Sequence, residues 1–332
     1  MLPRYCALLL SHGFLFALLP CSWDNPVWPK SNKSDTPLFR FVVNEEGFGA
    51  GYIDRDGNIV IPARFWGMGN YGDDDFFDGL AKVHGKDGYW YIDASGKPVT
   101  RADFATGHFS EGFATIWFRE KAGFIDRSGR LAIPALFDST EDFSEGLAAV
   151  RVKQKYGYID RKGRWAIRPR YLLVFAFSEG AARVIEDGPC VYTGYGPCSY
   201  VNATRLPYDK GSGFDPGLPR CRYSFIDREG RKLLEQDFVD AKDFTGGLAP
   251  VGDGHRWGYI DKSGTVRIPL QFEAAEPFAE GLARARKGRK WGYVDRTGRF
   301  VIPPQFDHAE DFSEDLAVVG FRAYKYWFID KA

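Results

Sequence analysis

The sequence predicts an all-β fold of about seven and a half tandem three-stranded β-meander repeats, each of about 34 residues, arranged as an open array. The first observation is composition, because 38 glycines, 19 prolines and 16% aromatic residues are typical of a protein rich in hairpins. The second is a Phe-Ser-Glu-Gly-Leu motif, with variants, that recurs in phase with the third. The third is an aromatic–aliphatic–Asp triplet at a nearly constant interval, ending at Asp54, Asp93, Asp126, Asp160, Asp227, Asp261, Asp295 and Asp330.

Each repeat contains signals for three strands in a fixed order. A short apolar run such as 147–152 comes first, and a middle strand such as 156–160 follows after a polar break. The middle strand leads into Asp-x-x-Gly, as at 160–163, which specifies a type I turn with a glycine bulge that closes a hairpin. A third strand such as 299–303 ends in proline, because proline cannot donate to a ladder.

The middle strand indicates how neighbouring repeats pack. Its glycine, for example Gly292, leaves room for a neighbouring backbone or ring to approach closely. Alternation places Trp291, Tyr293 and Asp295 on one side and Gly292 and Val294 on the other. One such sheet cannot bury its own apolar side, so we expect neighbours to cover it. A closed propeller-like ring is the alternative architecture, although propeller blades usually have four strands and about 40 residues.

Two segments carry nearly every landmark of the repeat at the same places, Arg256–Ala285 and Lys290–Val319. They resemble the WG repeat family, also called KWG, of mostly bacterial proteins. The Trp-Gly pair stands at 257–258 and 291–292 and drifts elsewhere, whereas the Ile-Asp and Asp-x-x-Gly landmarks hold better. The resemblance covers residues 38–332 apart from one insertion. It implies a β-repeat of unassigned function with no shared catalytic residues.

The N-terminal segment differs from the repeats. Residues 1–21 combine Arg4 with an apolar run, which predicts a signal peptide, and 22–36 read as a polar linker before the repeat domain of 37–332. We therefore expect an exported protein that is periplasmic, secreted or lipid-anchored at the cell envelope. Cys21 is a candidate for lipidation, although Pro20 stands where a lipoprotein signal prefers a small residue.

One interval is about twice the others and contains an insertion at about 187–222. It holds three cysteines that are candidates for a disulfide bond if the chain is exported, although their connectivity cannot be read from the sequence. Its tyrosines suggest a surface loop that contacts a partner, since loops on a rigid scaffold often carry function. These residues are Cys190, Cys198 and Cys221, and Tyr192, Tyr195, Tyr200 and Tyr208.

No pattern in the sequence predicts a catalytic residue, a cofactor or a metal site. The five histidines lack zinc-ligand spacing, and the calcium-like stretch Asp54–Asn58 lacks the distal glutamate, where Trp66 and Gly67 stand. Acids that recur in every repeat are expected to be structural, and Asp73–Asp75 are expected to be solvated. The recurring acids are Glu111, Glu145, Glu179, Glu280 and Glu314.

Charge is balanced overall but sorted within each repeat. Lys+Arg and Asp+Glu are both 44, which gives no support to nucleic acid as a partner. The connections are acidic, as at 310–315, and the hairpin turns are basic, as at 286–290. This sorting predicts either simple protection of strand edges or electrostatic docking of a partner or a neighbouring repeat.

These observations favour a non-enzymatic exported repeat scaffold that binds a protein or other macromolecular partner at the envelope. A glycan-binding module is the alternative, and a solvent-facing row of Trp90, Trp117, Trp257 and Trp291 would favour it. The least favoured hypothesis is an envelope enzyme with its site in the insertion.

Overall fold

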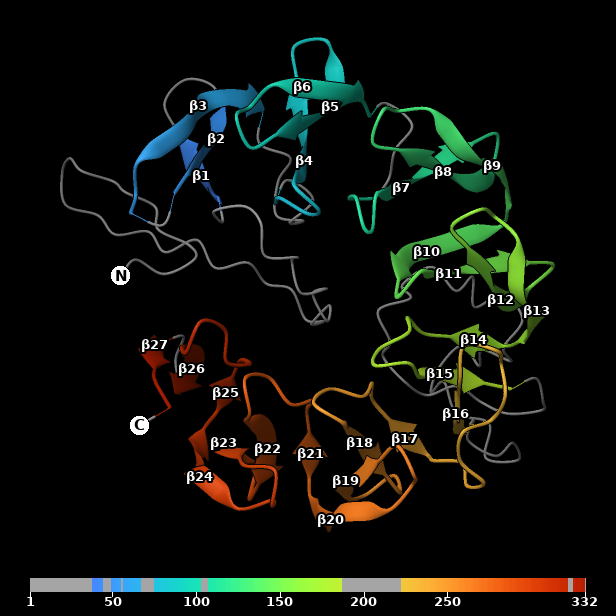
Figure 1. Cartoon of the computed structure of the whole chain (residues 1–332). Coiled ribbons are helices and arrows are strands. Elements are labelled where there is room, and N and C mark those ends of the chain that lie inside the picture. Colours follow the sequence, from blue (N-terminus) through green and yellow to red (C-terminus); the bar gives the residue numbers. More distant parts are fainter. Residues whose placement is uncertain are drawn as a thin grey trace, which may run out of the picture. The chain divides into compact units, whose positions relative to one another are not determined.

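The computed structural model describes residues 38–43, 49–54, 56–66, 75–102, 107–186, 222–321 and 325–331. Regular secondary structure in these residues is entirely β-strand (Figure 1). The predicted signal peptide, the linker and the insertion residues 187–221 lie outside the described residues. The described part of the chain has no helix of the length and apolarity that a membrane span needs.

The strands form separate antiparallel sheets in which neighbours along the chain pair with each other, and no sheet of the described residues closes into a barrel. The first sheet contains β1 (Phe39–Val43), β2 (Gly49–Ile53), β3 (Ile59–Trp66), β4 (Leu80–Gly85), β5 (Gly88–Asp93) and β6 (Pro98–Arg101). The next two sheets are β7 (Phe113–Phe118), β8 (Lys121–Asp126) and β9 (Leu131–Phe137), and β10 (Ser139–Ser144), β11 (Leu147–Val152), β12 (Lys155–Asp160) and β13 (Trp165–Tyr171).

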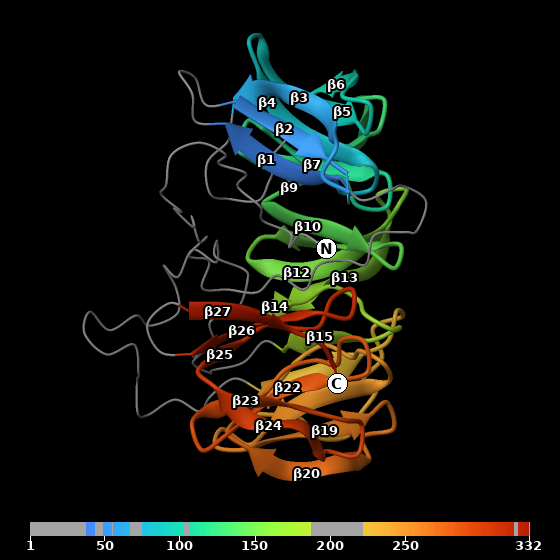
Figure 2. The same cartoon turned by 90° about the vertical axis from the view of Figure 1, so that its left-hand side faces the viewer.

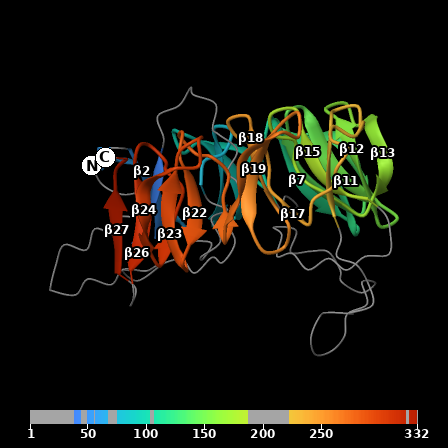
Figure 3. The same cartoon turned by 90° about the horizontal axis from the view of Figure 1, so that it is seen from below.

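The later sheets repeat the same order of strands. They are β14 (Leu173–Val174), β15 (Ala182–Ile185) and β16 (Tyr223–Ile226); β17 (Asp240–Ala241), β18 (Leu248–Gly252), β19 (Trp257–Asp261) and β20 (Val266–Phe272); β21 (Ala274–Ala275), β22 (Ala283–Lys287), β23 (Lys290–Val294) and β24 (Phe300–Phe306); and β25 (His308–Ala309), β26 (Ala317–Phe321) and β27 (Lys325–Ile329). Figure 2 and Figure 3 show β22, β23 and β24 side by side in this order.

The predicted tandem array of small antiparallel meanders is confirmed, with one addition. The connection between repeats holds a short strand, such as β17 or β21, that pairs with the first long strand of the next repeat. Several sheets therefore have four strands where the sequence indicated three. The long strands pair as predicted, for example β22 with β23 from Ala283↔Val294 to Lys287↔Lys290.

The chain divides into two compact units. Of the described residues, the first unit holds those up to Lys153 together with Ile159–Arg164, and the second holds the rest. The insertion lies between β15 and β16. These two strands pair directly with each other, from Ile185↔Tyr223 to Ala182↔Ile226.

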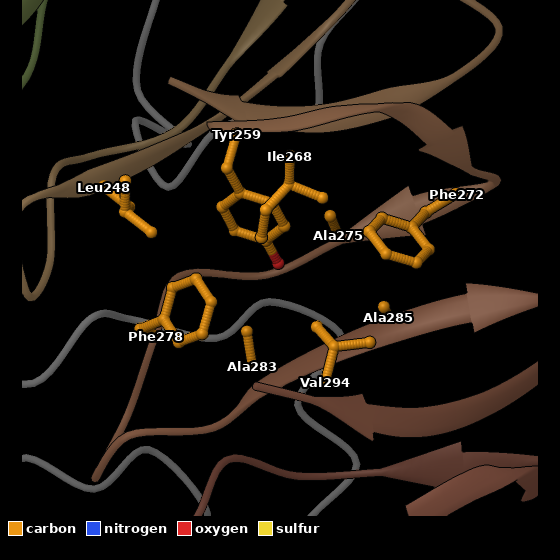
Figure 4. Close-up of a cluster of buried hydrophobic side chains, with 9 residues drawn as sticks. All are labelled: Leu248, Tyr259, Ile268, Phe272, Ala275, Phe278, Ala283, Ala285 and Val294. Carbon is orange, nitrogen blue, oxygen red and sulfur yellow. The ribbon is translucent and has the colours of Figure 1, made fainter. Parts of the chain in front are cut away.

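The core of each unit lies between successive sheets. In the second unit one cluster joins Tyr259 and Phe272 of β19 and β20 to Ala285 and Val294 of the next sheet (Figure 4). Tyr293, the neighbour of Val294, packs into another cluster with Phe312 and Val319 of the following sheet. The two faces of one middle strand are thus buried against two different neighbours, as expected for repeats that cover one another.

The middle-strand glycine has the role that the sequence predicted. A Cβ atom on Gly292 would lie 2.5 Å from the Ile302 oxygen and 2.7 Å from the Pro304 nitrogen. The outer strand bulges there, since Tyr293 pairs with Ile302 but Trp291 pairs with Phe306. Gly51, Gly123 and Gly258 meet their outer strands in the same way. The Trp-Gly pair therefore exists because only glycine admits this bulge.

Candidate functional site

The residues that the sequence singled out for binding lie outside the described residues. They are Cys190, Cys198, Cys221, Tyr192, Tyr195, Tyr200, Tyr208 and Cys21. The predicted disulfide, the predicted partner contacts and the predicted lipidation therefore stay predictions. The described residues contain other arrangements of charged and apolar side chains, which are built up below from their local structure.

The recurring aspartates close hairpin turns, as predicted. Asp261 Oδ1 accepts hydrogen bonds from the backbone N–H groups of Ser263 and Thr265, at 2.9 and 3.1 Å. Gly264 in the same turn has φ of 80°. A hydrogen bond from the Ser263 hydroxyl is the main cause that lowers the Asp261 pKa from 3.8 to about 2. Among the described residues no group of three or more histidine, cysteine or acidic side chains lies together as a metal site would.

The Phe-Ser-Glu-Gly motif forms a second tight turn in every repeat. In the copy at 110–113 the backbone groups of Ser110 and Phe113 bond each other in both directions. Both central residues have positive φ, 51° at Glu111 and 88° at Gly112. This is the geometry of a type I′ turn, which favours glycine at its second central position. In four copies the turn points its acid toward the corresponding turn of the next repeat.

The acids of these turns form what we call the carboxylate ladder, which consists of Asp78, Glu111, Glu179 and Glu280. In the first unit Asp78 accepts from the Gly112 N–H at 2.6 Å, and Glu111 accepts from the Gly146 N–H at 2.9 Å. Each acid also pairs with a basic residue of the next repeat, Arg127 or Arg161. The same carboxylate thus satisfies a turn amide and an ion pair across the interface between two sheets.

The ladder continues in the second unit. Glu179 accepts from the N–H groups of Gly246 and Gly247, at 2.5 and 2.8 Å, and lies 3.5 Å from the Lys262 ammonium. Glu280 accepts from the next turn at 2.7 and 3.0 Å and pairs with Lys331. The sorted charges predicted from the sequence therefore meet within the molecule, which is the neighbouring-repeat form of electrostatic docking.

A second network of charges is centred on two arginines with little exposure, Arg183 and Arg284. Arg183 donates to both carboxylate oxygens of Asp243, at 2.6 and 3.2 Å, and the two side chains are only 11% and 15% exposed. Arg183 also donates to the Ala241 carbonyl. Arg284 repeats this arrangement with Asp311 and the Ala309 carbonyl. Each arginine on a first long strand thus fixes the connection that leads into the next sheet.

Burial shifts the titration of this network. Desolvation raises the pKa of Asp311 above its ordinary value, although the Arg284 charge works against the shift. Burial also lowers the pKa of Lys242, whose ammonium lies 2.6 Å from Glu276. No motif in the sequence predicted this network. Its only signal is a single basic residue inside an otherwise apolar run, as in "AARVI" at 181–185.

The described histidines each have contacts of their own. His84 stacks on Tyr89, His108 pairs with Asp142 at 3.0 Å, and His308 pairs with Glu310 at 2.7 Å. Asp75 is half-buried, and Asp73 and Asp74 lie outside the described residues.

The four tryptophans considered for glycan binding differ in exposure. Trp257 and Trp291 are half-buried and pack against core clusters. Trp90 is also half-buried, and the Arg101 guanidinium lies 4.9 Å from its ring. Trp117 is exposed. The four tryptophans are therefore not all exposed, as the glycan-binding hypothesis required.

The third strands of the repeats carry exposed apolar side chains near their starts. Val266 and Val301 are 55% and 48% exposed, on β20 and β24. Val266 lies five residues after the turn aspartate Asp261, and the same position is held by Ile59 on β3, Leu131 on β9 and Trp165 on β13, all of them exposed. Val301 lies one position further along its strand, next to the half-buried Phe300. A proline follows in each of these strands, as at Pro269 and Pro303, and has no backbone N–H to donate to a further strand.

A protein-family model described as WG containing repeat matches residues 51–90, 123–156, 156–188, 223–253, 257–291 and 291–321. These segments cover more than half of the chain and leave out most of the insertion. None of the curated proteins matches the chain.

Among solved structures, a crystal structure of the eukaryotic initiation factor has a TM-score of 0.54 at 13% identity, covering 89% of this chain and 82% of that one. At this identity the likeness concerns the fold alone. Kluyveromyces lactis Hsv2 gives 0.36 at 8% identity, with 74% and 86% covered. A protein of unknown function from Bacteroides caccae gives 0.28 at 12% identity, with 80% and 93% covered.

Proposed function

Because the chain belongs to the family with the WG containing repeat, we propose that it is a non-enzymatic repeat scaffold that binds a protein partner at the cell envelope. The observation that carries this proposal is the set of exposed apolar side chains on successive outer strands. Apolar side chains that recur at one position of a repeat, on strands otherwise exposed to water, are typical of an interaction surface.

The mode of binding follows from the prolines. Pro269 and Pro303 lack the N–H that a strand-addition complex would use, so the partner contacts side chains rather than extending the sheet. The charged turns support an apolar binding surface, because the acids of the ladder, such as Glu179 and Glu280, already bind groups of the next repeat. The apolar outer strands are left to meet the partner.

The test is a capture experiment from envelope extract with two double variants. The first carries Val266→Glu and Val301→Glu, and the control carries Gln271→Glu and Gln305→Glu on the same two strands. All four positions are exposed, so both variants gain equal charge and are expected to fold. We expect the control to retain the captured protein and the valine variant to lose at least tenfold, about 1.4 kcal/mol of binding free energy.

Equal capture by both double variants would show that the outer strands are not the binding surface. Capture that survives protease treatment of the extract and is lost on glycosidase treatment would identify a glycan partner. A chain lacking 188–221 extends the experiment to the insertion, which we expect to set the choice of partner because loops on rigid scaffolds often do. Its loss of capture, with the outer strands intact, would assign specificity to the insertion.

Export is part of this proposal and rests on the segment 1–21. The prediction is checked by mass spectrometry of the mature protein in a bacterial host. Cleavage before Cys21 with an added diacylglycerol mass would show lipid attachment, whereas cleavage without that mass would show a soluble exported form. Retention of the whole segment on a cytoplasmic protein would contradict the proposal.

A further inference from the structure

One step of the carboxylate ladder lacks its acid. The turn at 244–248 reads Phe-Thr-Gly-Gly-Leu, so Gly246 stands where the other copies carry Glu or Asp. Its backbone has φ of 59°, close to 53° at Glu179 and 50° at Glu280. The turn is therefore built in the same shape without the side chain that would reach the next repeat.

The groups that this missing carboxylate would bind are all present. The corresponding amides in the next turn belong to Glu280 and Gly281, and within the described part of the chain neither N–H has a hydrogen-bond partner. Arg296 occupies the place of the basic residue in the next hairpin. Its Nη1 atom lies 2.8 Å from the position that a Cβ atom on Gly246 would take. These three donors thus stand at the repeat positions from which the preceding step of the ladder holds its carboxylate.

The ladder itself shows which ligand this set of donors takes. At the preceding step, two adjacent turn amides and Lys262 hold the carboxylate of Glu179. At the following step, two adjacent turn amides and Lys331 hold the carboxylate of Glu280. Two parallel N–H donors with a cation match both oxygens of a carboxylate.

The same turn loses a second contact between sheets. In two other copies the serine of the motif donates to a phenylalanine carbonyl of the next repeat, Ser110 to Phe143 and Ser178 to Phe244, both at 2.7 Å. Thr245 takes this place, and its buried hydroxyl oxygen has no hydrogen-bond partner. The interface between these two repeats is therefore incomplete at this turn alone among the copies compared.

We propose that the backbone N–H groups of Glu280 and Gly281 and the guanidinium of Arg296 form a binding site for a carboxylate of an acidic polypeptide segment. The polypeptide source follows from exposure, because Gly246, Glu280, Gly281 and Arg296 are all open to solvent. Three exposed donors hold a small free anion weakly, whereas a polypeptide adds contacts on either side of its carboxylate. The site is separate from the apolar outer strands, so either proposal can fail alone.

The experiment follows the backbone amide resonances of Glu280 and Gly281 by NMR during titration of the full chain. The probes are propionate, inorganic phosphate, a capped pentapeptide with a central glutamate and the same peptide with a central glutamine. We expect both carboxylate probes to shift these two resonances saturably, with the glutamate peptide at least tenfold tighter than propionate. The glutamine peptide is expected to leave both resonances unshifted.

Three variants make the test specific. Gly246→Glu restores the missing acid at a φ that glutamate already adopts in this fold, with only the mobile end of Arg296 having to move, and we expect it to abolish the shifts. Arg296→Gln is expected to weaken peptide binding at least tenfold. Arg299→Gln removes the same charge from the same hairpin and is expected to bind as the parent chain does.

Four outcomes would overturn the proposal. They are unshifted Glu280 and Gly281 resonances, equal shifts in the folded Gly246→Glu variant, equal binding by the Arg296 and Arg299 variants, and tighter binding of inorganic phosphate than of either carboxylate. Equal affinity for propionate and the glutamate peptide would show that the site binds free small carboxylates and would exclude a polypeptide as its specific ligand.

Discussion

Arg183 joins two sheets through one guanidinium, since it bonds both oxygens of Asp243 and the carbonyl of Ala241. The guanidinium of Arg183 also lies over an aromatic ring, with its carbon 3.9 Å from the Phe175 ring centroid. A buried charge of this kind is tolerated only while its donors are satisfied. The pair therefore fixes where the connection after β16 returns, rather than adding much free energy of its own.

Removing the charge of one partner should be costly for this reason. We expect Asp243→Asn to destabilise the protein by about 3 kcal/mol, because Arg183 stays buried without its counter-ion. Glu229→Gln is the control, because Glu229 pairs with the exposed Arg231 on the surface, where ion pairs are worth about 1 kcal/mol or less. Chemical denaturation measures both variants, and equal losses would show that burial does not set the cost.

The turn carboxylates determine how the protein responds to acid. The pKa of Asp261 is lowered from 3.8 to about 2 in the folded protein, so the folded state binds protons less readily than the unfolded chain. The resulting stabilisation is complete above pH 4 and is lost as the pH falls from 3.8 toward 2. The pKa of Asp93, Asp126 and Asp295 is also lowered, mainly by side-chain hydrogen bonds.

Asp261→Asn tests this linkage at one residue. We expect the thermal midpoint of the parent chain to fall as the pH decreases from 4 to 2, and the midpoint of the variant to fall less steeply, because one shifted carboxylate is gone. Circular dichroism melts at several pH values measure both slopes. Identical slopes would mean that Asp261 does not contribute to the acid sensitivity.

At the scale of a strand, glycine and bulge occur together. Where the middle strand has glycine, the outer strand bulges over it, as at Gly123 and Gly292. Where Trp90 stands at the glycine position, β5 and β6 pair in continuous register at that residue, with Trp90 opposite Arg101 and Tyr91 opposite Thr100. Where the Trp-Gly pair is lost along the chain, the geometry of the outer strand therefore changes as well.

Gly292→Ala tests the bulge rule. The new Cβ atom would meet the Ile302 oxygen and the Pro304 nitrogen, both in the backbone, so we expect a loss of about 2 kcal/mol or more. Gly85→Ala is the matched control, because its Cβ would contact only the Trp90 side chain at 3.7 Å and the Gly88 oxygen at 3.8 Å. Urea denaturation of both variants gives the comparison, and a smaller loss at Gly292 than at Gly85 would refute the rule.

Local signals explain why most of the fold could be predicted from the sequence. Asp-x-x-Gly turns and the middle-strand glycine each specify backbone geometry within a few residues, and both predictions are confirmed. The prediction that proline ends the third strand is wrong, because β20 and β24 continue past Pro269 and Pro303 to Phe272 and Phe306. Proline removes one donor from a ladder, and an outer strand with a bulge tolerates that loss. The short strands such as β17 could not be predicted, because two residues are too few to show the alternation of a strand. The ladder and the Arg183–Asp243 pair escaped for another reason. They join side chains 34 to 68 residues apart, and spacing alone does not show that two charges meet.

At the scale of the whole molecule, each repeat depends mainly on its neighbours in sequence. In the second unit the step from Glu179 to Gly246 and Gly247 spans the insertion, yet it has the same contacts as the step from Glu280 to the next turn. Ser178 likewise reaches Phe244 across the insertion. In such an array stability is approximately a sum of repeat and interface terms, so the insertion interrupts the chain without interrupting the stack.

This organisation predicts that the chain lacking 188–221 folds as the parent chain does. The deletion leaves Glu186, Asp187 and Arg222 between β15 and β16, a loop length that hairpins commonly use, and the pairing Ile185↔Tyr223 needs no change. Shortening the loop lowers the entropy cost of closing the hairpin, so we expect a free energy of unfolding equal to the parent value or about 1–2 kcal/mol higher.

Denaturant unfolding of three chains measures this: the parent, the deletion variant and a variant in which 188–221 are replaced by a Gly-Ser segment of equal length. Because the Gly-Ser chain keeps the loop length and loses its sequence, it separates closure entropy from contacts made by the insertion. A deletion variant less stable than the parent, together with an equally destabilised Gly-Ser chain, would show that the insertion packs on the repeats. The sheets on either side of it would then not be self-sufficient, and the nearest-neighbour description of this array would fail.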